Sequence, residues 1–279
     1  MSNKFIEFFR NIAPPQTTPS REKDILKKIE AGIANGEFKT HLQFIVNNKT
    51  KKIVSAEALS RWENSDGETI SPGAYIPLME KAGLIANLDY YMFENACGKL
   101  AEWKNSEFDE LTLSCNFTRI TISEKDFVSK IKEIADRYDF ERTKLLIEIT
   151  EDSIEKNLDI AMSNIRKIKE LGFRIALDDI GSGYTSLMNL CEYPIDVVKL
   201  DRGVLLLTNG ERGRKLFWGI ISLAHYLNLT VVCEGVETDE QNNLVTESDC
   251  DYIQGWYYSK ALPEFAAETF AREYMSKFI

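Results

Sequence analysis

The sequence predicts an α/β protein whose strands close into a (β/α)8 barrel, and three observations support this fold class. Short β-like apolar runs alternate with longer stretches of helical period along most of the chain. Eight such runs fit within the 279 residues, which suits a single barrel of about 250 residues. The polar loop NNKTKK joins the first two runs as an antiparallel hairpin, whereas helix-length segments separate the later runs, as in parallel β/α units.

The predicted elements follow one another along the chain, each strand being a short apolar run. Strands are expected at HLQFIV (41–46), KIVSAEAL (52–59), LTLSCNF (111–117), KLLIEIT (144–150), FRIALD (173–178), DVVKL (196–200), TVVCE (230–234) and CDYIQ (250–254). Helices are expected near residues 21–35, 74–82, 88–104, 123–138, 152–171, 209–227, 238–247 and 263–277. A doubly wound open sheet is the competing interpretation, and no clear internal repeat decides between the two.

The composition is that of an ordinary soluble globular protein, with 44% hydrophobic residues, 28% charged residues and a net charge of −10. This acidic balance argues against polymeric nucleic acid as a partner, because DNA- and RNA-binding faces need basic stripes. The five cysteines show no CxxC or zinc-like spacing, which favours reduced thiols in the cytoplasm. With only two histidines, any metal site must use oxygen ligands, which suits Mg²⁺, Mn²⁺ or Ca²⁺.

Residues 1–20 are predicted to form a short helix and a Pro-rich linker that precede a barrel over residues 21–279. The apolar patch at the start is interrupted by Lys4, Glu7 and Arg10, so it is too short and too charged for a signal peptide or a membrane span. Because no other long uncharged apolar run is present, we expect a cytoplasmic protein without a membrane span.

Polar side chains lie at or near the ends of seven consecutive predicted strands. The carboxyl ends of barrel strands open on one face, so these side chains would meet in a single pocket. A polar residue at one strand end usually marks only the start of a loop, but that explanation is weak for seven strands in succession. The residues are Glu57, Asn116, Glu148, the pair Asp178 and Asp179, Lys199, Glu234 and Gln254.

Five of these side chains are carboxylates and only one is a lysine. Lys199 cannot neutralise all of them, but divalent cations can. Two cations about 3.5–4 Å apart that share a carboxylate form a clamp for in-line attack on a phosphate ester. The adjacent Asp178 and Asp179 in LDDIGSGYTSL are therefore predicted to face metal ions.

The glycines of the same segment admit a rival interpretation as a dinucleotide-binding fingerprint, with Asp201 as the ribose-binding acid. This signal is weak, because Ser186 replaces the third glycine and two carboxylates ahead of the turn would repel a pyrophosphate. Gly181 and Gly183 are instead interpreted as allowing a tight, mobile turn. A plain structural turn is the alternative.

The sequence resembles the EAL-domain phosphodiesterases, which hydrolyse cyclic di-GMP. The similarity begins at Glu57-Ala58-Leu59 in SAEALSRW and continues in the family order through ISPGAYIPLMEKAGLI, SCNFTR, IEITED, LDDIGSGYTSL, DVVKLD, CEGVET and YIQGWYYSKAL. It covers nearly everything from residue 22 to 270. It implies a modified TIM barrel with an antiparallel first strand pair, cleavage to linear pGpG in bacterial second-messenger signalling, and a homodimer.

The resemblance also implies a site with two Mg²⁺ or Mn²⁺ ions and inhibition by Ca²⁺. Asp178 would bridge the two ions, and Asp179 would bind the second. The implied metal-binding residues are Glu57, Asn116, Glu148, Asp178, Asp179 and Glu234.

The catalytic residues implied by the resemblance are Lys199, Glu234 and Glu57. Lys199 would contact the nucleophilic water, and Glu234 would act through metal-bound water or as a general base. Substrate contacts are implied for Gln43 in a guanine pocket, for Arg61 at a phosphate, and for Leu59 and Gln254. The alternatives are a surface ion pair for Arg61 and a structural counter-charge to Asp201 for Lys199.

Four further residues would stabilise loops around the site: Glu151, Gly181, Gly183 and Glu237. The chain departs from the family at Phe44, where a proline is common, and at Cys233, where an alanine is common. These departures put affinity and rate in question more than the reaction class. Because the full ligand set is present, an active enzyme is favoured over the alternative of a non-catalytic cyclic di-GMP receptor. Trp62, Trp256, Tyr257 and Tyr258 are expected to be packing residues.

Overall fold

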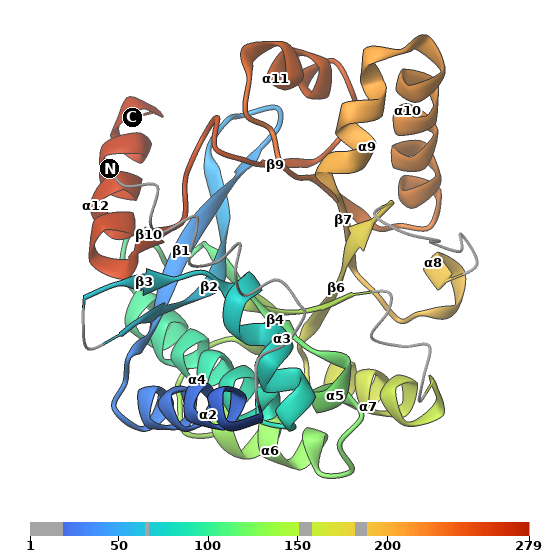
Figure 1. Ribbon diagram of the computed structural model, residues 1–279. Helices are drawn as coiled ribbons and strands as arrows, with labels where there is room; N and C mark the ends of the chain where they lie inside the picture. The colour runs from blue at the N-terminus through green and yellow to red at the C-terminus, as the bar shows by residue number, and fades with distance from the viewer. Residues whose placement is uncertain (1–18, 65–66, 151–157, 182–188, 279) are drawn as a thin grey trace.

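Eight strands close into a barrel in the computed structural model, which describes residues 19–64, 67–150, 158–181 and 189–278 (Figure 1). The order around the barrel is β1, β9, β8, β7, β6, β5, β4 and β2, and β2 pairs with β1 again. The predicted barrel is therefore confirmed, and the competing open sheet is wrong.

The barrel strands are β1 (Phe38–Asn47), β2 (Ile53–Glu63), β4 (Thr112–Phe117), β5 (Leu145–Thr150), β6 (Arg174–Ile180), β7 (Val197–Leu200), β8 (Thr230–Cys233) and β9 (Tyr252–Gln254). Short strands β3 (Thr69–Ile70) and β10 (Leu262–Pro263) extend the sheet. The helices are α2 (Pro19–Ala34), α3 (Pro72–Ala82), α4 (Ile85–Trp103), α5 (Arg119–Ile122), α6 (Phe127–Ala135), α7 (Leu158–Glu170), α8 (Asn189–Glu192), α9 (Arg202–Leu206), α10 (Glu211–Tyr226), α11 (Asp239–Thr246) and α12 (Glu264–Met275).

The predicted strands and longer helices are found with shifted ends, and the start of the predicted helix 152–171 lies outside the described residues. The sequence did not predict the two short strands or the short helices α5, α8 and α9, because elements of two to five residues show no clear period. The predicted segment 1–20 lies outside the described residues apart from its last two, so that domain boundary stays a prediction.

The first strand runs antiparallel to both of its barrel neighbours, β2 and β9, while the remaining neighbours are parallel. The expected antiparallel first pair is thus confirmed. β2 is longer than predicted, because Trp62 pairs with both Phe38 of β1 and Ile70 of β3. Glu57 therefore lies in the middle of its strand, and its predicted place near the strand end is wrong.

Strand β4 separates apolar from polar side chains through its alternation. Alternate residues point to opposite faces of a strand. Leu113, Cys115 and Phe117 are buried in the core beneath the helices, where Phe117 packs 5.7 Å from Phe93 of α4 between ring centroids. The intervening Thr112, Ser114 and Asn116 are left to face the barrel interior. None of the described helices is long and apolar enough to cross a membrane.

Candidate active site

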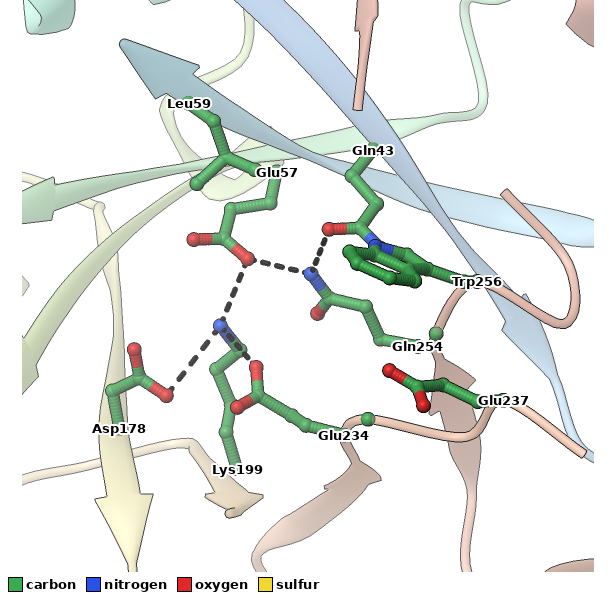
Figure 2. A pocket seen from close by; sticks show the side chains of 11 residues that line it. Gln43, Glu57, Leu59, Asp178, Lys199, Glu234, Glu237, Gln254 and Trp256 are labelled. Carbon is green, nitrogen blue, oxygen red and sulfur yellow. Dashed lines mark hydrogen bonds and ion pairs between the residues drawn. The ribbon is translucent and has the colours of Figure 1, made fainter. Parts of the chain in front are cut away.

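Lys199 of β7 lies at the centre of the polar cluster inside the barrel and is almost completely buried (Figure 2). Its Nζ lies 2.7 Å from Glu234, 2.9 Å from Glu148, 3.2 Å from Glu57 and 3.5 Å from Asp178. These carboxylates come from different strands or strand ends, far apart in the sequence. Closure of the barrel therefore brings the predicted residues to one point.

Two amides hold the carboxylate of Glu57. Asn116 Nδ2 donates to one oxygen at 2.7 Å, and Gln254 Nε2 donates to the other at 2.6 Å. The same Gln254 nitrogen lies 3.4 Å from Gln43 Oε1, and Gln43 Nε2 donates to the Ser259 carbonyl at 3.0 Å. Glu57 is thus fixed by residues from three other strands and strand ends, as Figure 2 shows for Gln43 and Gln254.

A bulge at the end of β6 turns the two adjacent aspartates toward the site. The register to β7 shifts between Leu177 and Ile180, and Asp179 has a φ of 60°, which is uncommon for a residue with a side chain. Gly181 follows with a φ of 94°, and a Cβ there would come within 2.1 Å of Val204. A side chain at Gly181 would therefore clash with α9, and the predicted mobile turn through Gly183 continues into residues outside the described ones.

This turn places carboxylate oxygens close together. One oxygen each from Asp178, Asp179 and Glu234 lies within 4.8 Å of the others. Like charges at this distance repel one another unless a proton or a cation intervenes.

The protonation equilibria reflect this crowding. Burial raises the pKa of Glu148 well above its usual value, and the charge of Glu57 adds to the shift. Burial also raises the pKa of Glu234 to about 8 and that of Asp179 to about 6, and the charge of Asp178 adds to both. Glu148 and Glu234 therefore lack enough positive charge nearby to stay fully ionised at neutral pH, whereas Asp179 is mostly ionised there.

Glu57 and Lys199 behave differently from the other charged groups. Burial disfavours ionised Glu57, but the charge of Lys199 and hydrogen bonds from Gln254 and Asn116 outweigh burial and lower its pKa. Burial also disfavours charged Lys199, yet the carboxylates around it raise its pKa well above the usual value. An ionised Glu57–Lys199 pair therefore sits among acids that are short of counter-charge.

The donor set fits a hard divalent cation. It consists of carboxylate and amide oxygens, the ligands that Mg²⁺ and Mn²⁺ prefer. Asp178, Asp179 and Glu234 are close enough to share an ion, and Glu57 and Glu148 contact the same lysine as Asp178 and Glu234 do.

Cation binding is expected to strengthen as pH rises. Metal ligation requires ionised carboxylates, and Glu234 and Asp179, with pKa values raised to about 8 and about 6, hold protons in acid. We expect Mn²⁺ to bind at least about 100-fold more tightly near pH 8 than near pH 5.5, with release of protons. Titration calorimetry in two buffers of different ionisation enthalpy measures both quantities. Equal affinity at the two pH values would contradict the prediction.

A cavity of about 310 Å³ opens above this cluster. Besides residues of the cluster around Lys199, its wall includes Gln43, Leu59, Glu237 and Trp256. The indole of Trp256 is 62% exposed, so the expectation that it is a packing residue is wrong. Burial of Trp62, at 6% exposed, agrees with that expectation.

Two predicted residues lie at the edge of the site. Arg61 is not among the described residues that line the cavity, and its Nη1 donates to the Ser60 carbonyl at 2.8 Å. Glu237 accepts from both terminal nitrogens of Arg202 at 2.7 and 2.8 Å, which ties its loop to the start of α9. The sequence does not predict the role of Arg202, because no local pattern links this residue to Glu237. Glu151 and Gly183 lie outside the described residues.

Comparison with known proteins identifies relatives. The chain matches the EAL domain family over residues 26–261. It is 29% identical over 276 residues to the signaling protein YkoW of Bacillus subtilis, covering 99% of this chain and 34% of YkoW. It is 28% identical over 256 residues to the cyclic di-GMP phosphodiesterase NbdA of Pseudomonas aeruginosa, covering 91% of this chain and 33% of NbdA. The chain thus spans about a third of the length of these curated relatives.

Solved structures show the same fold. The PaMucR phosphodiesterase in complex with c-di-GMP is 26% identical, with a TM-score of 0.82, and the match covers 88% of this chain and 99% of that chain.

Proposed function

The chain belongs to the EAL domain family, and from that premise we propose that it is a metal-dependent phosphodiesterase that hydrolyses cyclic di-GMP to linear pGpG in the bacterial cytoplasm. The observation that carries this proposal is the contact of Lys199 with four carboxylates, all within 3.5 Å, at the floor of an open cavity. The relatives named as cyclic di-GMP phosphodiesterases, and the c-di-GMP complex of PaMucR, support the choice of substrate.

In this proposal two Mg²⁺ or Mn²⁺ ions, when bound, lower the pKa of a water molecule and neutralise charge on the phosphate. The residues that would hold them are Glu57, Asn116, Glu148, Asp178, Asp179 and Glu234.

The chain's own side chains have distinct parts in the reaction. Lys199 places a permanent positive charge at the cavity floor, where it orients attacking water and stabilises charge that develops on the phosphoryl oxygens. Glu234 borders the cavity and, in its ionised form, would accept a proton from water there. Gln43, Leu59 and Gln254 line the same cavity and would contact the substrate, and Arg61 would contact a phosphate from its rim.

Purified chain incubated with cyclic di-GMP and Mg²⁺ or Mn²⁺ tests the proposal. We expect linear pGpG, identified by chromatography and mass. Binding without turnover would instead support a non-catalytic receptor. A protein that neither binds nor cleaves cyclic di-GMP would contradict both the enzyme and the receptor hypotheses.

Trp256 is expected to contribute to substrate affinity. Its exposed indole borders the cavity beside Gln43, and Lys260 Nζ lies 5.5 Å from the centre of its ring (Figure 2). Stacking of a base on an aromatic ring is worth about 1–3 kcal/mol. Trp256→Ala should therefore raise KM for cyclic di-GMP by roughly 5- to 100-fold with little change in kcat.

Two variants serve as controls for this result. Trp256→Phe keeps an aromatic face and should lose less affinity than Trp256→Ala. Tyr226→Ala removes an 86% exposed aromatic side chain at the end of α10, outside the cavity, and should leave KM unchanged. A KM for Trp256→Ala equal to that of the native protein would refute the stacking role.

We also propose that the protein forms a homodimer. Exposed apolar side chains are concentrated on α9, the turn that follows it, and α10: Leu206, Leu207, Leu216 and Trp218 are 41–56% exposed. Burying such side chains against a second copy would stabilise a dimer. Light scattering coupled to gel filtration gives the molar mass that tests it.

A further inference from the structure

A second cavity, of about 240 Å³, lies inside the barrel on the opposite side of the charged cluster from the first. We call it the lower cavity. Lys199 lines both cavities, and Glu148 lines only the lower one. The lower cavity extends toward the N-terminal ends of the strands, where Glu110 and the first residue of β6, Arg174, border it.

One wall of the lower cavity is polar. It is formed by Ser55 of β2 together with Thr112 and Ser114 of β4. Thr112 Oγ1 donates to Ser55 Oγ at 2.8 Å, and Ser55 Oγ donates to the Thr112 carbonyl at 3.1 Å. Ala176 of β6 and Val197 of β7 are among the apolar side chains that line the rest of the cavity.

Ser114 is the feature that points to a ligand. It is 1% exposed and lines the lower cavity, and its hydroxyl makes no hydrogen bond of normal geometry among the described residues, although it lies near enough to Glu148 to lower the pKa of that carboxyl group. The strand register places it opposite Glu57 of β2, and two residues before Asn116, which pairs with Glu148. A buried hydroxyl without a hydrogen bond of normal geometry is costly, so the position calls for a small polar molecule.

The polar lining of this cavity favours a hydrated cavity over an empty one. Empty cavities in proteins are apolar, whereas a buried water needs roughly 15–30 Å³ and two to four polar partners. The lower cavity is several times larger and offers the Ser114 hydroxyl, the Glu148 carboxylate and the Lys199 ammonium group.

We propose that the lower cavity is an internal water site, in which water bound at Ser114 bridges to Glu148 and holds that carboxylate in place. Ser114 is thereby a positioning residue that acts on the cation site through water. The link to cation binding rests on the proposed function, whereas occupancy of the cavity by water does not.

Ser114→Val fills part of the lower cavity with methyl groups and removes the hydroxyl. In a high-resolution crystal structure of the native protein we expect water within hydrogen-bond distance of Ser114 Oγ, and in Ser114→Val we expect that water to be lost. We expect the affinity for Mn²⁺, measured by calorimetry, to fall about tenfold, the effect typical of a group that supports a metal ligand. Ser114→Thr keeps the hydroxyl and should retain most of the affinity.

Two more variants separate this effect from damage to the fold. Ser248→Val makes the same change at a buried serine that lines neither cavity, and should leave Mn²⁺ affinity unchanged. Ala176→Val fills the lower cavity from β6, two strands away from β4, and leaves Ser114 intact, so it should also weaken Mn²⁺ binding if Ser114→Val does not fold.

A lower cavity without ordered water in the native crystal, or equal Mn²⁺ affinity in native protein, Ser114→Val and Ala176→Val, would overturn the inference. If the native protein binds no Mn²⁺, the proposed function fails, and the crystallographic water at Ser114 still decides the nature of the cavity.

Discussion

Replacement of Glu57 by alanine is expected to abolish hydrolysis of cyclic di-GMP. Glu57 contacts Lys199 and accepts hydrogen bonds from Asn116 and Gln254, so its loss removes a cation ligand and the group that these side chains surround. Cation catalysis supplies several kcal/mol, and each 1.4 kcal/mol corresponds to a factor of ten, so kcat/KM should fall by about 1000-fold. Product formation at saturating Mn²⁺ gives the measurement.

Glu63→Ala is the matched control for this experiment. Glu63 lies on the same strand, outside the cavity lining, and its side chain is 40% exposed beside His41. This variant should retain native activity. Glu57→Gln keeps the shape but not the charge, and it should be nearly as inactive as Glu57→Ala. Native turnover in Glu57→Ala would refute the role of Glu57 as a ligand.

The second large effect is expected from Lys199→Met, in stability as well as in turnover. Lys199 is the cation shared by Glu57, Glu148, Asp178 and Glu234, and its side chain is 2% exposed. Removing one partner of a buried ion pair costs about 3–5 kcal/mol. Without divalent cations, we therefore expect Tm to fall by about 10 °C.

The loss of stability should depend on pH and on metal. A carboxyl group whose folded-state pKa is raised destabilises the fold when it ionises, so stability falls as pH rises through that pKa. The charge of Lys199 keeps the pKa of Glu57 low in the native protein, so in Lys199→Met that pKa should rise, and the stability deficit relative to the native protein should grow between about pH 5 and pH 8. Added Mn²⁺ should restore part of the Tm, because it replaces the missing positive charge.

Lys215→Met provides the comparison. Lys215 pairs with Glu211 on the surface of α10 at 2.7 Å, with both side chains at least 70% exposed, and surface pairs contribute little. Its Tm should match that of the native protein. A Lys199→Met protein as stable as Lys215→Met in EDTA would show that the cluster does not depend on the lysine charge.

The amino-acid pattern predicted a barrel, with an open sheet as the alternative, and it predicted which polar side chains meet in the cluster. Alternation along β4 separates Leu113, Cys115 and Phe117 from Thr112, Ser114 and Asn116, and this period is a property of neighbouring residues. The polar residues at successive strand ends could be recognised in the same way, because parallel strands of a barrel open on one face.

What only the tertiary structure decided are contacts between segments distant in the chain. The pairing of Trp62 with β1 and β3 set Glu57 in mid-strand, and barrel closure set four carboxylates around Lys199. The same holds for the exposed ring of Trp256, the Arg202–Glu237 pair and the lower cavity. The period of the residue pattern along a strand determines which face a side chain lies on. Strand register and barrel closure determine which residues that side chain contacts, and both depend on the packing of the whole chain.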